Sequence, residues 1–223
     1  RDIRVMKGPT TKEKRLVLFE NPFLEMLTLA SIWLFAAVWI VVLPLIAFVG
    51  WGTVSVSTAV GLSLGGLLVW SLFEYIAHRH LFHWEPQWLP ARQLVFAIHG
   101  NHHAQPTDHL RNLMPPIVSL PVAGFIWALC YALAGNAGTW FVFGFLVGYV
   151  LYDLTHYACH QWSMRGRIGK VIKKHHMRHH FMGEDGNFGV TTPLWDHVLD
   201  TRISSAGRVS AKAMRELPVH SAE

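Results

Sequence analysis

The stretch that decides the fold is MLTLASIWLFAAVWIVVLPLIAFVGWGTVSVSTAVGLSLGGLLVWSLF, from Met26 to Phe73, whose 48 residues include no Asp, Glu, Lys, Arg or His. A second run of the same kind extends over 41 residues, from Asn112 to Tyr152. A single helix crosses the hydrocarbon core of a bilayer with roughly 20 residues, so each run is long enough to cross twice. The two runs therefore predict an all-α integral membrane protein with four transmembrane helices in two hairpins.

Glycine-containing turns divide the two runs. Gly50 to Thr53 divides the first run, and Gly135 to Gly138 divides the second. The last span is expected to continue as helix to His160. The expected spans lie near residues 27–49, 54–73, 117–134 and 140–152.

Two further glycine-rich stretches, 61–66 and 144–148, lie inside expected spans. Small residues let membrane helices approach closely, so close packing is favoured over space for a bound chain.

Composition agrees with a membrane location and gives an orientation. Hydrophobic residues make up 52% of the chain and charged residues only 15%, well below the quarter typical of soluble domains. All 19 Lys and Arg residues lie within residues 1–23, 78–112 or 165–215. Since basic residues are retained on the cytoplasmic side, both termini and the central loop are predicted to be cytoplasmic, in a bacterial inner membrane or the endoplasmic reticulum. The net charge of +5 is attributed to topology and anionic headgroups, and no nucleic-acid partner is predicted.

The chain is expected to form a single membrane-embedded domain, 1–223. Its parts are a cytoplasmic or interfacial segment 1–23, the transmembrane helices and central loop 24–160, a cytoplasmic cap 161–203 and a flexible tail 204–223. The cap is expected to contain a helix from Gly166 to about Phe181, followed by a glycine-rich loop, Gly183 to Gly189.

Histidine is the chemically informative residue type. Of 15 histidines, ten form four spaced groups on the predicted cytoplasmic side. The groups are His78 and His83; His99, His102 and His103; His156 and His160; and His176, His179 and His180.

The spacing of these histidines suits metal chelation. On a helix, residues three and four apart share a face, so His-x-x-His-His presents its imidazoles in one direction. A closed zinc site needs four ligands, whereas ten candidates favour two metal ions with five or six ligands each. His78 and His83 are five apart, so either His83 lies beyond the helix end or the two serve different metals.

Chance is the competing explanation, and it differs by group. His78 alone could cap a helix, and a pair such as His156 and His160 arises by chance fairly often. Two copies of His-x-x-His-His, flanked by two further groups on the same side, make chance a poor explanation.

Three residues are candidates to support the ligands from outside the metal site. Metal-bound imidazoles usually donate their second N–H to a carboxylate or a carbonyl. Glu74, four residues before His78, and Asp153, three before His156, have this spacing, although both could simply mark where a helix meets water. His175 is assigned a supporting role because only His176 reproduces the spacing to His179 and His180.

The remaining histidines are His80, His109, His197 and His220. None of them fits the spacing of the four groups. His197 is expected to be structural and His220 solvated.

The motifs resemble the fatty acid hydroxylase superfamily, and within it the fatty acid and ceramide 2-hydroxylases. The matching text is HRHLFH (78–83), FAIHGNHHAQPTDHLRNLMPP (96–116), GYVLYDLTHYACH (148–160) and KKHHMRHHFMGEDGNFGVTTPLWDHVLDT (173–201). The similarity covers about residues 16–201. Leu199-Asp200 departs from the family pattern, and no His-Pro-Gly-Gly motif of the cytochrome b5 domain carried by many eukaryotic members occurs in the 223 residues.

The resemblance implies that the ten histidines hold two iron ions, with no catalytic residue beyond these ligands, while Asp108 and Arg111 match framework positions. It implies O2-dependent hydroxylation, most simply at carbon 2 of a fatty acyl chain, free or in ceramide or another lipid. Hydroxylation of an unactivated C–H bond needs a redox metal, so zinc found in a purified sample would be a substitute. Electrons are expected from a separate cytochrome b5- or ferredoxin-type donor.

Two alternatives remain open at this point. The first is oxidation or desaturation of a sterol, carotenoid or aminolipid within the same superfamily. The second is a membrane metal-binding protein without catalysis, which the absence of charged residues in the middle of the spans disfavours.

Overall fold

The computed structural model describes residues 15–203, whose regular structure is entirely helical. The predictions for the tail 204–223, His220 and residues 1–14 lie outside this part of the chain. The helices in chain order are α1 (Pro22–Leu27), α2 (Ile32–Gly50), α3 (Val56–Ala77), the π-helix η1 (His78–Phe82), α4 (Leu89–Val95), the π-helix η2 (Phe96–Gly100), α5 (Asn101–Ala104), α6 (Pro116–Ala134), α7 (Asn136–Gln161), α8 (Arg167–Met182) and α9 (Leu194–Val198).

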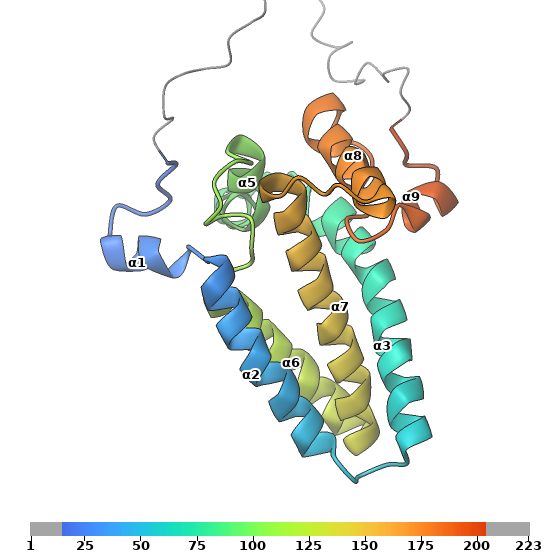
Figure 1. Ribbon diagram of the computed structural model, residues 1–223. Helices are drawn as coiled ribbons and strands as arrows, with labels where there is room; N and C mark the ends of the chain where they lie inside the picture. Colours follow the sequence, from blue (N-terminus) through green and yellow to red (C-terminus); the bar gives the residue numbers. More distant parts are fainter. Residues whose placement is uncertain (1–14, 204–223) are drawn as a thin grey trace, which may run out of the picture.

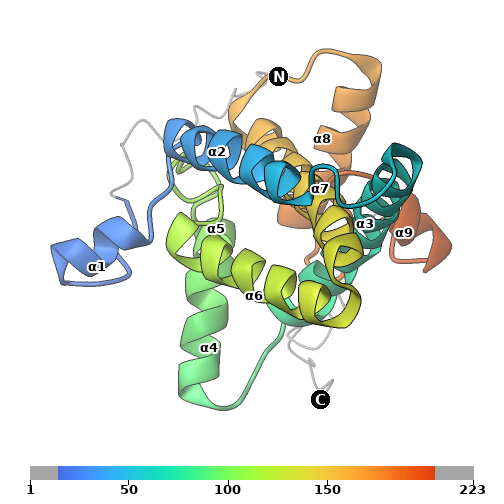
Figure 2. The same ribbon diagram turned by 90° about the horizontal axis from the view of Figure 1, so that it is seen from below.

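Four of these segments are long and apolar enough to cross a membrane, which confirms the prediction of four spans. They are Ile32–Gly50, Val56–Phe82, Pro116–Ala134 and Asn136–Gln161. Figure 1 shows them side by side, with α5, α8 and α9 gathered at one end. Viewed from below in Figure 2, α7 lies between α2, α3 and α6, while α1 and α4 project sideways from the bundle.

Local capping sets where the spans begin and end. The first begins at Ile32 rather than near Leu27, because the Ser31 hydroxyl accepts a hydrogen bond from Leu34 N at 3.1 Å. Ser55 caps the second span in the same way. The turn between the last two spans is shorter than predicted: Gly135, with φ of +56°, is the break, and Asn136 already begins α7.

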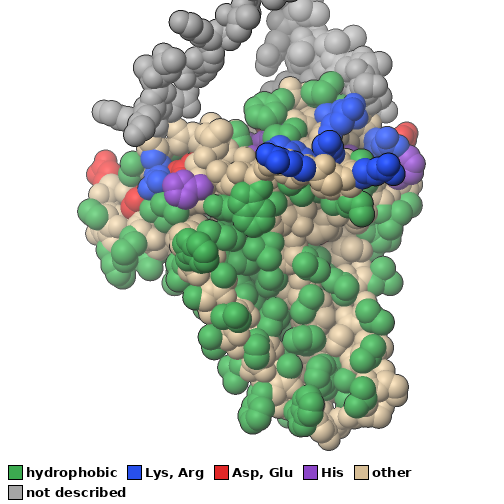
Figure 3. Space-filling model, viewed as in Figure 1, with side chains coloured by type: hydrophobic (Ala, Val, Ile, Leu, Met, Phe, Trp, Pro, Cys, Tyr) green, Lys and Arg blue, Asp and Glu red, His purple; other side chains and the backbone are tan. Residues whose placement is uncertain are grey.

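Aromatic side chains from α2, α3 and α7 fill the centre of the bundle. The Trp39 and Tyr149 rings lie 5.0 Å apart, and Trp70 lies 4.9 Å from Phe145 and 5.4 Å from Tyr149. Their edge-to-face arrangement is favourable because the ring edge is positive and the face negative. On the face seen in Figure 3 the bundle carries mainly hydrophobic side chains, and the Lys and Arg side chains visible there gather near one end. The protein is an integral membrane protein.

Small residues bring α3 and α7 into contact, as predicted from the two glycine-rich stretches. A Cβ atom on Gly66 would overlap the carbonyl oxygen of Phe141, and one on Gly144 would overlap that of Ser63. The backbones therefore touch at both glycines, and neither side has a flexible group that could move away.

This packing gives a testable contrast between two neighbouring glycines. Gly66→Ala is expected to lower the thermal unfolding temperature of the purified protein in detergent, because the new methyl group meets backbone atoms; overpacking of this kind costs about 1–3 kcal/mol. Gly65→Ala is the control, because a Cβ atom there meets nothing within 4 Å. Alanine is also the better helix former, so this variant should melt at or slightly above the wild-type temperature. Equal melting of the two variants would contradict the packing argument.

Candidate metal centre

A π-helical turn brings His78 and His83 together. In η1 the backbone widens, and His83 N donates to His78 O at 3.3 Å, an i to i+5 hydrogen bond. Residues five apart then lie above one another, which a regular α-helix would not allow. His83 lies just beyond the end of η1, which is the first of the two alternatives considered from the sequence. His78 and His83 belong to the same candidate metal group.

The structure gathers all ten candidate ligands at one end of the bundle, where they form two groups. Within each group, the ligand atoms all lie within 4.8 Å of one another. Group A consists of His78, His83, His99, His103 and His179. Group B consists of His102, His156, His160, His176 and His180.

The two His-x-x-His-His motifs are divided between the groups. His99 and His103, four residues apart, belong to group A, while His102 on the same turn belongs to group B. In α8, His179 belongs to group A, and His176 and His180 belong to group B. Each of these two segments therefore supplies ligands to both groups. The ends of the membrane spans supply one group each: His78 and His83 belong to group A, and His156 and His160 to group B.

The nitrogen atoms are spaced like ligands of a common ion. In group A, His78 Nε2 lies 3.1 Å from His99 Nε2, and in group B, His156 Nε2 lies 2.9 Å from His102 Nε2. With metal–nitrogen bonds of about 2.1 Å, ligands at right angles would be about 3.0 Å apart. Each group therefore fits one metal ion.

Backbone carbonyls occupy the other ring nitrogen of three of these histidines. The Nδ1 atoms of His78, His156 and His179 lie 2.6, 2.9 and 2.8 Å from the carbonyl oxygens of Phe188, Asn112 and Gly186. A carbonyl only accepts, so Nδ1 carries the proton and the lone pair of Nε2 points into the group. The lone pairs of His78 and His156 face His99 Nε2 and His102 Nε2 at 3.1 and 2.9 Å, and a metal ion at each place would be attracted to both nitrogens, which supports metal binding.

Burial favours the neutral form of His83, His102, His176 and His179, the form of imidazole that binds a metal. Desolvation, followed by the neighbouring imidazoles, holds the pKa of His102, His176 and His179 well below the usual value. At His83 desolvation and His103 lower the pKa to about 4.

Glu74 and Asp153, the two carboxylates expected to orient His78 and His156, do not bond to these rings. Glu74 Oε1 accepts from Val190 N and Thr191 N at 3.3 and 3.0 Å. Asp153 Oδ2 accepts from Met114 N at 3.1 Å and from the Tyr149 hydroxyl at 2.8 Å. The prediction that these carboxylates contact the rings directly is therefore wrong, because backbone carbonyls accept the Nδ1–H of both histidines. The two carboxylates instead bind backbone amides of loops that pack against the ligands.

His175 lies outside both groups, as expected. It is buried, and its Nε2 lies 2.9 Å from Asp196 Oδ2. Burial alone would raise the pKa of the Asp196 carboxyl, but hydrogen bonds from His175, Thr201 and Gly189 lower it below its ordinary value. Asp196 is the acceptor that the sequence interpretation missed, although it stands in the family string around Trp195.

The other described histidines, His80, His109 and His197, are exposed. The two framework residues tie the N-terminal segment to the central loop. Arg111 forms an ion pair with Glu25, and Asp108 forms one with Arg15 at 2.8 Å.

An apolar cavity of about 180 Å³ reaches the end of the bundle that carries the histidines, where Phe82 and Tyr152 line it. It lies among α3, α6 and α7, with Trp70, Ala123 and Phe145 among its lining residues. At its metal-site end, the Phe82 ring stacks on His99 at 5.1 Å and the Tyr152 ring stacks on His156 at 6.0 Å. An apolar chain in this cavity would end at the Phe82 and Tyr152 rings, one residue layer away from the histidine groups.

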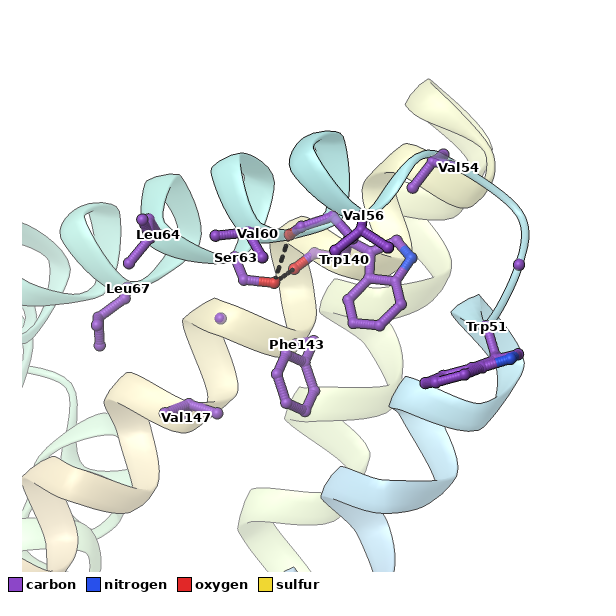
Figure 4. A pocket seen from close by; sticks show the side chains of 13 residues that line it. Trp51, Val54, Val56, Val60, Ser63, Leu64, Leu67, Trp140, Phe143 and Val147 are labelled. Atoms are coloured by element: carbon purple, nitrogen blue, oxygen red, sulfur yellow. Dashed lines mark hydrogen bonds between the residues drawn. The ribbon is translucent and has the colours of Figure 1, made fainter.

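A larger hollow of about 600 Å³ lies at the other end of the bundle. Figure 4 shows its lining side chains, among them Trp51, Val60 and Phe143, with the Ser63 hydroxyl donating to the Ala59 and Trp140 carbonyls. It is lined by the opposite ends of α3 and α7 from those that carry histidines, so it is separate from the candidate site.

Fold and site together define a class: helical membrane proteins with a histidine-rich candidate metal centre next to an apolar cavity. The chain belongs to the fatty acid hydroxylase family, whose model matches residues 63–201.

The relatives that the chain matches are named as hydroxylases of fatty acids or of fatty acyl chains in ceramide. The chain is 35% identical over 192 residues to a dihydroceramide fatty acyl 2-hydroxylase of Arabidopsis thaliana, covering 82% of this chain and 78% of the relative. It is 38% identical over 154 residues to a fatty acid 2-hydroxylase of Rattus norvegicus, covering 66% of this chain and 41% of the relative. The solved structure of full-length Scs7p, in which only the hydroxylase domain is visible, is similar with a TM-score of 0.76 and 33% identity, covering 82% of this chain and 70% of that one.

Proposed function

We propose that this protein hydroxylates carbon 2 of a fatty acyl chain, free or carried in ceramide or another lipid. The observation that carries the proposal is the apolar cavity that ends at Phe82 and Tyr152, whose rings stack on His99 of group A and His156 of group B. The relatives' names support the position of the hydroxyl group on the chain.

The ten histidines of groups A and B are proposed to hold two iron ions, and zinc would fit the same nitrogens in a purified sample. Iron would supply the activation of O2 that an unactivated C–H bond requires. The overall reaction consumes the acyl C–H bond, O2, two electrons and two protons, and it yields the alcohol and water.

The chain's own residues bind and orient the acyl group. From Tyr152 to Phe145 the cavity follows two turns of α7, about 10 Å, which accommodates roughly eight methylene groups. A longer chain would continue into the bilayer between α3 and α6. Apolar walls exclude water from the reacting carbon, and the Tyr149 hydroxyl bonded to Asp153 fixes the wall beside it.

The electrons are proposed to come from a separate cytochrome b5- or ferredoxin-type protein. The distribution of Lys and Arg supports a cytoplasmic location for both termini and for the histidine end of a single hydroxylase domain. The membrane would be the bacterial inner membrane or the endoplasmic reticulum.

Mass spectrometry of hydrolysed lipids tests the reaction directly. Cells that express the protein with a suitable electron donor are expected to accumulate 2-hydroxy fatty acids, and cells that express His99→Ala are not. Intact-lipid analysis then identifies the carrier. An added oxygen on a sterol, carotenoid or aminolipid would contradict the proposal, as would no product from folded, iron-loaded protein that the donor reduces.

A further inference from the structure

Residues 186–191, here called the carbonyl loop, lie between α8 and α9. Two backbone carbonyls of this loop fix the orientation of histidine rings. Gly186 O accepts from His179 Nδ1 at 2.8 Å, and Phe188 O accepts from His78 Nδ1 at 2.6 Å. Both histidines belong to group A. The Phe188 ring also packs on group A, with its centre 5.8 Å from His78, 5.9 Å from His83 and 5.8 Å from His179.

The amide groups of residues 187–191 point to acceptors on other segments. Asn187 N donates to Thr201 O at 2.9 Å. Phe188 N and Gly189 N donate to Asp196 at 2.8 and 2.7 Å. The next two amides donate to Glu74 of α3. Five consecutive donors are thus held on one side, which leaves the carbonyls of Gly186 and Phe188 free to face group A.

Asp196 is the main anchor of this arrangement. It is fully buried, and each of its carboxylate oxygens accepts two hydrogen bonds. Oδ1 accepts from Phe188 N and from the Thr201 hydroxyl at 2.7 Å, and Oδ2 accepts from Gly189 N and from His175 at 2.9 Å. Hydrogen bonds to a charged acceptor are about twice as strong as neutral ones, so Asp196 fixes the loop more firmly than a neutral residue could.

Group B is oriented from a different segment. His156 Nδ1 donates to the backbone carbonyl of Asn112 at 2.9 Å. Asn112 lies in the central loop before α6, and Gln161 donates to its side chain at 2.9 Å. The two groups are therefore held by separate segments of the chain.

We infer that Asp196 is a positioning residue for one metal position alone: through the carbonyl loop it fixes His78 and His179, and so it controls metal binding in group A but not in group B. The inference rests on the proposed function, in that each group must hold a metal ion. Partners that orient metal ligands typically contribute about 10- to 100-fold to metal affinity.

The test is a cobalt(II) titration of the full chain, purified in detergent and stripped of metal, against a competing chelator. The wild type is expected to bind two ions, and His160→Ala identifies the step that belongs to group B. Asp196→Asn keeps the size of the side chain but places an amide N–H₂ where an oxygen accepted hydrogen bonds. It should weaken one ion about 10- to 100-fold and leave the other unchanged. His197→Ala, on the same short helix with an exposed side chain, should bind both ions like the wild type.

The possible results separate this inference from the proposed function. Wild-type protein that binds fewer than two ions would overturn both. Two unchanged ions in Asp196→Asn, or two ions weakened equally in a protein with wild-type helical circular dichroism, would overturn the inference alone.

Thr201→Val decides the matter if Asp196→Asn does not fold. This variant removes the hydrogen bond from the Thr201 hydroxyl to Asp196, together with the one between that hydroxyl and Tyr75 at 3.1 Å. It should weaken only the group A ion, about 2- to 10-fold. No weakening, or equal weakening of both ions, would overturn the inference.

Discussion

Replacing His78 with alanine is expected to reduce lipid hydroxylation to less than about one thousandth of the wild-type rate, because this oxidation has no metal-free route. His78 is fully buried, and its two ring nitrogens contact the Phe188 carbonyl and His99. Its loss leaves group A with four imidazoles and leaves the carbonyl without its donor. Metal content should therefore fall together with the rate, from two ions per chain toward one.

His80→Ala is the matched control for this prediction. It lies in the same π-helix, two residues further on, but its side chain is exposed and belongs to neither group. Its rate, measured by mass spectrometry of 2-hydroxy fatty acids, and its iron content should equal those of the wild type. Normal activity of His78→Ala would remove that residue from the ligand set and with it the assignment of group A.

The requirement for both groups can be read from a double variant. If the two metal positions act as a unit, His78→Ala combined with His160→Ala should be no slower than either single variant, because each alone already abolishes the reaction. A large residual rate in either single variant would show that one metal position suffices.

Much of the architecture follows from local sequence. Two uncharged runs define four spans because the thickness of a bilayer sets the length of a helix that crosses it. The ten histidines share one end of the bundle because each segment carries them at its own end, close to charged residues. Even the start of α2 at Ile32 has a local signal, since Ser31 is a common type of N-cap residue.

The division of the histidines into groups A and B could not be read from spacing. His99, His102 and His103 share a short segment, but His102 turns toward His156 of α7, His99 toward His78 of η1 and His103 toward His179 of α8. This division depends on where three other helices place their own histidines. The π-helical turn at His78 likewise has no simple sequence signature, and a regular helix would have separated His78 from His83.

Backbone partners were the least predictable part of the site. Carboxylates were expected beside the ligands because their side chains identify them, whereas any residue has a carbonyl. Asp153 and His156 do share a face of α7, but one binds the amide of Met114 and the other the carbonyl of Asn112, so both hold the same segment. Spacing thus identified the correct face of the helix but not its contacts.

Substitutions that fill the cavity near groups A and B are expected to have the second large effect on the rate of hydroxylation. Ala123 of α6 is buried and lines this cavity between Ser119, near the histidine end, and Ile126, further into the bundle. Larger side chains at this position would occupy the space proposed for the acyl chain. The series Ala123→Val, Ala123→Leu and Ala123→Phe is therefore expected to lower the rate on long acyl chains stepwise, by about 10- to 200-fold at the largest side chain.

Metal content separates this effect from damage to the site. Ala123 lines the cavity and belongs to neither histidine group, so all three variants should keep two metal ions per chain and the wild-type circular dichroism spectrum. Ala128→Phe is the control on the same helix, because Ala128 lines a different hollow, with Trp127 and Tyr131. It should hydroxylate lipids at the wild-type rate.

Chain length provides the sharper test of where the substrate lies. The filled part of the cavity lies away from the histidines, so an acyl chain short enough to end before Ala123 should lose less rate in Ala123→Leu than a long chain does. Assays with a series of acyl lengths would measure this difference directly. If short and long chains lose rate equally, the substituted residue acts through packing. If neither loses rate in a folded, metal-loaded protein, the acyl chain approaches the histidines by another path and the cavity is not its binding site.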